Sequence, residues 1–167
     1  MPQPTNPVTN VVFAGLGGQG VLKASDIAAD AAFRSGYDVK KSELHGMSQR
    51  GGSVSSDVRF GSRVFSPMVP PGEADFLVVI APGQVEVNQW QLRAGGILIT
   101  PDAVDQRALS NKKTLNVALL GLLSNFVEIP EERWLEAIRA NVPPRFLDVN
   151  LAAFALGRRA TLTEVTQ

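Results

Sequence analysis

The chain is 167 residues long, with 44% hydrophobic and 19% charged residues, a composition typical of one globular domain with a sizeable core. Lysine plus arginine and aspartate plus glutamate both number 16, so no net charge attracts the chain to nucleic acid or to an anionic membrane. The sequence has no cysteine, which excludes disulfides and cysteine-ligated zinc or iron–sulfur sites within it. Neither a signal-like start nor an apolar run of the roughly 20 residues that span a membrane is present, so we expect a cytoplasmic protein.

The first candidate site is a glycine-rich loop near the N-terminus. An apolar run, a turn of glycines and a segment with alanines at helical spacing follow one another over residues 11–34, which predicts strand, tight loop and helix, a Rossmann-like start. Gly15, Gly17 and Gly20 match G-x-G-x-x-G, a loop that brings main-chain N–H groups and a helix N-terminus to a phosphate. A tight structural turn is the alternative.

The residues beyond this loop favour a phosphate over a dinucleotide ribose. A nicotinamide site usually carries Asp or Glu about 20 residues past the loop. Here Asp38 and Glu43 flank Lys40 and Lys41, and two lysines suit a phosphate better than a ribose diol.

A second candidate loop, residues 40–52, is polar, punctuated by glycines and holds the only histidine. Ser48, Gln49 and Arg50 offer hydroxyl, amide and guanidinium donors to a phosphate or carboxylate. A structural salt bridge at Arg50 is the alternative. Acid–base catalysis by His45 is an alternative, but His45 has no second histidine for a metal and no nucleophile in a recognisable motif. We therefore interpret it as an ordinary hydrogen-bonding residue and predict no catalytic residue in this chain.

The remaining chain alternates between strand and helix patterns. Apolar alternation and continuous apolar runs predict strands, and periodic apolar positions predict helices. The predicted strands are 37–39, 53–60, a return strand 63–66 that makes a hairpin across Gly61, 76–80 and 96–100. The predicted helices are Val21–Arg34, 84–94, 114–126, one that begins at Pro130, and 145–156 ended by Gly157. In the last of these, Phe146 has the helical spacing of a core residue.

Two long motifs in this order resemble a known family. Residues 15–21 read Gly-Leu-Gly-Gly-Gln-Gly-Val and residues 43–54 read Glu-Leu-His-Gly-Met-Ser-Gln-Arg-Gly-Gly-Ser-Val. Together they resemble the small, gamma-type subunit of 2-oxoacid:ferredoxin oxidoreductases, most of all the indolepyruvate type, with aromatic 2-oxoacid relatives such as phenylglyoxylate enzymes close by. The resemblance covers about residues 8–157, with 158–167 as a tail.

The resemblance implies a three-layer α/β domain with a mostly parallel sheet and, with the predicted hairpin, one antiparallel pair. It implies a hetero-oligomeric oxidoreductase that decarboxylates a 2-oxoacid with thiamine diphosphate, forms an acyl-CoA and reduces ferredoxin or another acceptor. Thiamine diphosphate and iron–sulfur clusters would belong to partner subunits, and this chain would bind no cofactor alone and no metal. It would contact coenzyme A in the complex through the following residues: Gly15, Gly17, Gly18, Gln19, Gly20, Ser48, Gln49 and Arg50.

Two other functions remain open at this stage. A structural assembly subunit of the same complex is supported by the apolar segment 114–126, which a partner subunit could cover. A free-standing NAD(P) or flavin dehydrogenase is supported by the glycine loop alone. Trp90 and Trp134, in helix-like segments, are interpreted as core or interface anchors.

Overall fold

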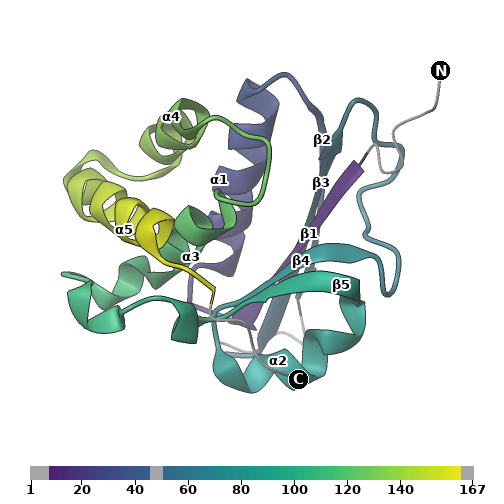
Figure 1. Ribbon diagram of the computed structural model, residues 1–167, viewed down its shortest axis with the longest axis horizontal. Helices are drawn as coiled ribbons and strands as arrows, with labels where there is room; N and C mark the ends of the chain where they lie inside the picture. Colours follow the sequence, from purple (N-terminus) through teal and green to yellow (C-terminus); the bar gives the residue numbers. More distant parts are fainter. Residues whose placement is uncertain (1–7, 46–50, 163–167) are drawn as a thin grey trace.

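The computed structural model describes residues 8–45 and 51–162, which form a five-stranded mixed sheet of order β2-β3-β1-β4-β5 (Figure 1). The central strand β1 (Val8–Leu16) is parallel to β4 (Ala74–Val79), which is parallel to β5 (Leu92–Ile99). On its other side β1 pairs antiparallel with β3 (Ser53–Gly61), and β3 pairs antiparallel with the edge strand β2 (Asp38–His45). Four strands share one direction, which confirms the predicted α/β class with a mostly parallel sheet.

The strand, loop and helix at the start of the chain lie where the sequence predicts them. Helix α1 spans Val21–Arg34 and buries its alanine-rich face on the sheet. It ends at Ser35, followed by Gly36 with φ of 91°, the left-handed conformation common after a helix end. Because helices cover one face of β1 and a second apolar cluster covers the other, its residues 11–14 are almost completely buried.

The hairpin predicted across Gly61 is wrong, because residues 63–66 form no strand. Side-chain carboxylates take up backbone donors that a strand partner would otherwise satisfy: Val64 N donates to Asp38 Oδ2 at 2.8 Å, and Val69 N donates to Asp57 Oδ2 at 2.9 Å. The antiparallel pairs are instead β2 with β3, which are consecutive in the chain, and β3 with β1.

The helix predicted over 84–94 is also wrong. Only Val85–Asn88 is α-helical (α2), with 3₁₀ turns at Pro82–Gln84 and Gln89–Gln91, and β5 begins at Leu92. The backbone of β5 runs so close to β4 that a Cβ added at Gly96 would lie 3.0 Å from the Ala74 carbonyl oxygen. Residues from Leu92 onward therefore pair with β4 as part of β5 and do not continue helix α2.

Four helices cover one face of the sheet: α1, α3 (Leu115–Leu123), α4 (Glu131–Asn141) and α5 (Leu147–Arg159) (Figure 1). Residues 116–123 of α3 are all buried by this chain itself, so no partner subunit is needed to cover that apolar segment. The prediction that Gly157 ends the last helix is wrong, because Gly157 lies inside α5. There it faces α3 so closely that an added Cβ would stand 1.8 Å from the Ala118 carbonyl oxygen.

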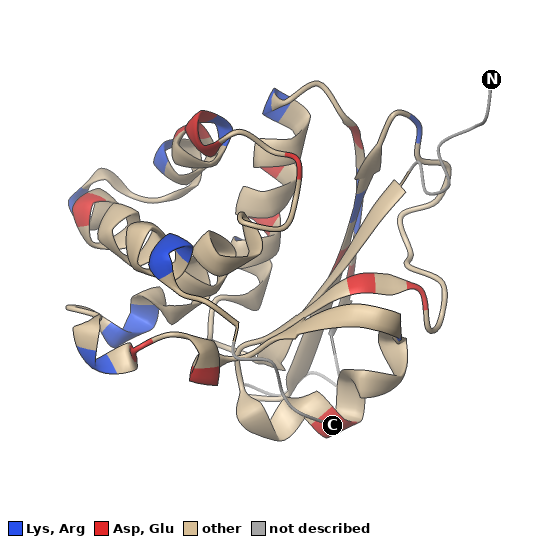
Figure 2. Cartoon of the chain, viewed as in Figure 1, with Lys and Arg blue, Asp and Glu red and all other residues tan. Residues whose placement is uncertain are grey.

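The opposite face of the sheet has a thinner cover. A small apolar cluster on this face contains Val12 and Leu77 and is closed by Val69 and the start of α2 at Val85. Figure 2 shows acidic and basic residues interspersed along the described chain, as expected from their equal numbers. Within residues 8–45 and 51–162, no helix has both the length and the apolar character needed to cross a membrane.

Candidate functional site

The glycine loop leaves β1 and opens helix α1 with its backbone exposed to a pocket. Gly20, the residue before the helix, has φ of 80°, which strongly favours glycine, and a Cβ there would lie 2.5 Å from Asn116 Nδ2. The first helical bond runs from Ala24 N to Gly20 O, so the N–H groups of residues 21–23 precede the helical ladder. No side chain caps this helix start, which leaves a backbone site of the type that binds anions.

Gln19 has a structural role in this loop. Its Oε1 accepts a hydrogen bond from Leu16 N at 2.8 Å, which folds the side chain back over the turn. The side-chain oxygen is therefore committed to the loop, and the side-chain amide group is the part that remains for a ligand.

The two sequence motifs meet at the carboxyl end of β1. Gly17 N donates to Gly52 O at 2.9 Å, and a Cβ added at Gly17 would lie 3.1 Å from Gly51 N, so the two glycine segments touch backbone to backbone. The predicted binding residues Ser48, Gln49 and Arg50 lie outside the described residues. Gly51 and Gly52, which directly follow these residues in the second motif, contact Gly17 of the first motif.

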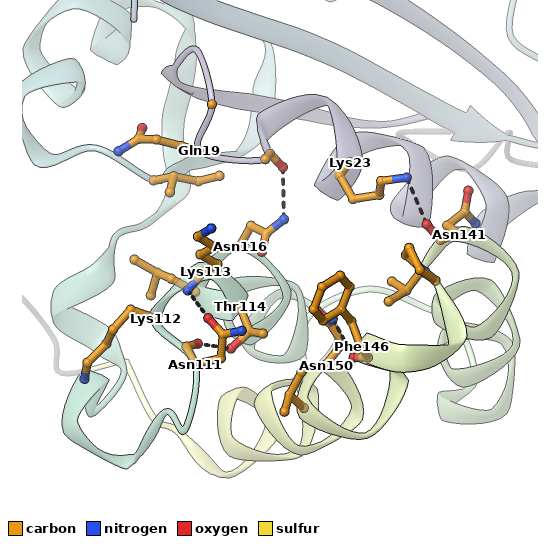
Figure 3. Close-up of a pocket in the computed structure, with 17 residues that line it drawn as sticks. Gln19, Lys23, Asn111, Lys112, Lys113, Thr114, Asn116, Asn141, Phe146 and Asn150 are labelled. Atoms are coloured by element: carbon orange, nitrogen blue, oxygen red, sulfur yellow. Dashed lines mark hydrogen bonds between the residues drawn. The ribbon is translucent and has the colours of Figure 1, made fainter.

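Two pockets border the glycine loop. The larger, about 470 Å³, lies between the N-terminal ends of α1 and α3 and the connection from α4 to α5 (Figure 3). The smaller, about 300 Å³, lies toward β3 and includes Gly17 and Val54, next to the second motif. The polar and charged residues of the larger pocket are Gln19, Lys23, Asn111, Lys112, Lys113, Thr114, Asn116, Asn141 and Asn150.

The larger pocket contains residues that the sequence prediction missed, above all Lys112, Lys113 and Asn116. Asn116 Nδ2 donates to Gly20 O at 3.1 Å and so ties α3 to the glycine loop, whereas its buried Oδ1 has no hydrogen-bond partner among the described residues. A signal was present in the sequence: two lysines stand directly before an apolar helix, where the helix dipole disfavours positive charge.

The predicted contribution of Lys40 and Lys41 to the loop site is not supported by their positions. Both lie in strand β2, and Lys41 Nζ bonds to Asp26 at 2.5 Å and also to Glu43. Burial lowers the pKa of Lys41, but the hydrogen bonds to these two carboxylates outweigh it, so the pKa is raised above its ordinary value. The charge of Lys41 is neutralised locally.

The chain is therefore an α/β domain whose glycine loop presents backbone N–H donors suited to an anion. Its described residues hold no group of three or more histidine, aspartate or glutamate side chains placed to bind a metal.

Comparison with known proteins places this domain. Residues 10–160 match the pyruvate ferredoxin/flavodoxin oxidoreductase family, and the chain belongs to that family. It is 36% identical to the indolepyruvate oxidoreductase subunit IorB of Thermococcus kodakarensis, over 90% of this chain and 95% of that one. The predicted resemblance to gamma-type small subunits is confirmed.

Solved structures show the same fold. The gamma subunit of a keto/oxoacid ferredoxin oxidoreductase from Geobacter sulfurreducens has a TM-score of 0.76 at 23% identity, covering 89% of this chain and 95% of that one. A 2-oxoglutarate:ferredoxin oxidoreductase from Magnetococcus marinus, solved with 2-oxoglutarate, coenzyme A and succinyl-CoA bound, also has a TM-score of 0.76 at 19% identity. This chain matches 31% of that protein's chain and 92% of its own length.

Proposed function

We propose that this chain is the small, non-cluster subunit of a thiamine diphosphate-dependent 2-oxoacid oxidoreductase that forms an acyl-CoA and reduces ferredoxin or another acceptor. The similarity to IorB along nearly the full length of both chains supports an aromatic 2-oxoacid, such as indolepyruvate or phenylglyoxylate, as the substrate. Thiamine diphosphate and iron–sulfur clusters belong to partner subunits in this proposal, in keeping with a chain that has no cysteine.

The same proposal assigns this chain a contact with coenzyme A on the entry side of the active site. The observation that carries it is the bond from Gly17 N to Gly52 O, which joins the glycine loop to the segment that contains Ser48, Gln49 and Arg50. Backbone N–H groups at the start of α1 and a guanidinium group offer complementary donors to one phosphate. The smaller pocket, beside Val54, supplies space next to both motifs.

The test is Arg50→Ala in the assembled complex. Loss of one charge-assisted hydrogen bond costs about 1.5 to 3 kcal/mol, so the Michaelis constant for coenzyme A should rise roughly tenfold or more, with a smaller change for the 2-oxoacid. Arg139→Ala, at an exposed position on α4, is the matched control and should leave both constants unchanged. Unchanged coenzyme A saturation in the Arg50 variant would assign this segment to subunit contact instead.

A structural assembly role is the second candidate, and a specific observation favours it. Trp90 and Val87 are more than half exposed beside the thinly covered sheet face, where an aromatic anchor could bind a partner subunit. Coenzyme A affinity measured with and without this subunit separates the two roles, because a purely structural subunit would not alter that affinity once the partners are assembled.

The topology disfavours a free-standing NAD(P) or flavin dehydrogenase. In the dinucleotide-binding fold the strand that presents the ribose-binding acid lies beside the first strand. Here β3 lies between β1 and β2, and the carboxylate of Asp38 accepts Val64 N instead. A titration of the chain with nicotinamide and flavin nucleotides checks this.

A further inference from the structure

The larger pocket carries a positive charge that the proposed coenzyme A contact does not use. Three lysines line it, Lys23, Lys112 and Lys113, and no aspartate or glutamate does. None of the three forms an ion pair with another described residue. Lys23 Nζ donates to Asn141 O at 2.9 Å and Lys112 Nζ to Gln106 O, so two of these ammonium groups are held by neutral backbone oxygens.

The helix ends around the pocket reinforce this charge. Helices α1 and α3 both start at the pocket without an acidic residue in the first turn. Helix α5 also starts there and has Asp148 in its first turn, but Asp148 does not line the pocket. Asn111 Oδ1 accepts a hydrogen bond from Lys113 N in the turn before α3. Lysines beside a helix N-terminus are unfavourable unless an anion lies between them. Figure 2 shows basic segments on the turns that lead into α3. The lining of the pocket therefore carries three positive charges and no negative one.

The α4–α5 side of the pocket contributes most of its apolar lining, together with Asn141 and Asn150. Val142, Pro143 and Phe146 line the pocket from the connection between α4 and α5, and Val149 lines it from the first turn of α5. Phe146 lies across the cavity from Lys113 (Figure 3). Phe146 is 40% exposed although the sequence predicted it in the core. At about 470 Å³, the pocket falls within the range of small-molecule sites. The buried, unpartnered Oδ1 of Asn116 lies in the wall between the lysines and the glycine loop.

We propose that this pocket binds a small organic phosphate, such as a nucleoside monophosphate. The phosphate lies against Lys112, Lys113 and the N-terminal turn of α3, and the flat or apolar part of the ligand packs on Phe146 and Val149. The pocket shares Gly18, Gln19 and Gly20 with the proposed coenzyme A contact. The inference nevertheless goes beyond the proposed function, because the pocket lies on the α3 side of the glycine loop and needs neither Arg50 nor a partner subunit.

Calorimetric titration of the full chain with AMP, adenosine and inorganic phosphate tests the proposal. AMP should bind at least tenfold more tightly than adenosine or inorganic phosphate, since only AMP engages both walls. The double variant Lys112→Ala/Lys113→Ala should bind AMP at least tenfold more weakly. Arg139→Ala/Arg159→Ala removes two charges at exposed positions that do not line the pocket and should bind like the wild type. No AMP binding at millimolar concentration, equal binding of phosphate alone or adenosine alone, or equal loss in both double variants would overturn the proposal.

Two sources of such a phosphate are separated by a second measurement. If the lysine double variant also raises the Michaelis constant for coenzyme A in the assembled complex, the pocket holds the nucleotide end of coenzyme A. If that constant is unchanged while AMP binding is lost, the ligand is a separate nucleotide. Arg50→Ala should leave AMP affinity unchanged, so a failure of the proposed function and a failure of this inference are told apart.

Discussion

At the scale of single residues, the Asp57 carboxylate accepts a backbone hydrogen bond that a neighbouring strand would otherwise accept. Asp57 lies in β3, is only 5% exposed and accepts the backbone N–H of Val69, which fastens the segment after β3 across the second face of the sheet. Burial raises the pKa of Asp57 above its ordinary value of 3.8, although the Val69 hydrogen bond and the nearby Arg59 act in the opposite direction. The folded chain thus holds a proton at Asp57 more tightly than the unfolded chain does.

Asp57→Asn should therefore change the pH dependence of stability. An asparagine Oδ1 can still accept the Val69 bond and does not ionise, whereas ionisation of Asp57 costs folding free energy as pH rises through 3.8 and the raised pKa. The free energy of unfolding of the variant, minus that of the wild type, should rise as the pH increases from 3.8 through the raised pKa of Asp57 and then stay constant. Urea unfolding across this range measures it, with exposed Asp102→Asn as the control for loss of one negative charge. A difference that is flat or falls with pH would contradict the assignment.

At the scale of elements, the crossing of α3 and α5 depends on two glycines. A Cβ added at Gly121 would lie 2.1 Å from the Phe154 carbonyl oxygen, and one added at Gly157 would lie 1.8 Å from the Ala118 carbonyl oxygen. Backbone atoms cannot give way as a flexible side chain can, so any side chain at either position must push the helices apart. The contact between these helices supports the buried Trp134–Phe154 pair, whose ring centroids are 5.9 Å apart.

Gly157→Ala should accordingly destabilise the chain in spite of alanine's higher helix propensity. That propensity favours alanine by about 1 kcal/mol, while overpacking of a tight core typically costs 1–3 kcal/mol and occasionally more. The difference is about 0–2 kcal/mol, and because the added Cβ meets backbone atoms we expect a net loss near the upper end, about 2 kcal/mol, in the free energy of unfolding measured by urea denaturation. Gly83→Ala, where an added Cβ meets no atom within 4 Å, should be close to neutral. Equal stability of the two variants would show that the helices are not this close.

The success of sequence reasoning differed between elements for physical reasons. Helix α1 was predicted with its observed bounds because its alanine spacing, its glycine start and its Ser35–Gly36 end all indicate the same helix. The segment 84–94 has helical composition, but β5 extends backward to pair with β4 and leaves only α2. Such pairing between distant segments overrides local preference and is not visible in the local pattern.

At the scale of the whole molecule, the described chain buries its own apolar helices and has a continuous core on the helical side of the sheet. A domain with such a core should fold by itself, and we expect the purified chain to unfold cooperatively. With no cysteine to hold a cluster and no nucleophile–base set predicted, it should be colourless and should not reduce a dye when given a 2-oxoacid and coenzyme A. Activity should appear only when partner subunits are added. Turnover by the chain alone would contradict its assignment as an accessory subunit.

The candidate site was only partly predictable. The glycine loop and the Gly51–Gly52 segment are each a continuous stretch of sequence that can be recognised by itself. They meet because β1 ends and β3 begins at the same edge of the sheet. The wall built by Lys112, Lys113 and Phe146 comes from segments far apart along the chain that only the helical layer brings together. Phe146 was assigned to the core because its spacing is helical, but the 3₁₀ turn Pro144–Phe146 places it at the pocket.

The bond from Gly17 N to Gly52 O has a consequence for how motion in this chain can be followed. A backbone amide proton exchanges with solvent only when its hydrogen bond opens. The exchange rate of the Gly17 amide therefore measures how often the two motifs separate. A single amide on the first motif thus reports on the local opening of the second, without any label attached to either loop.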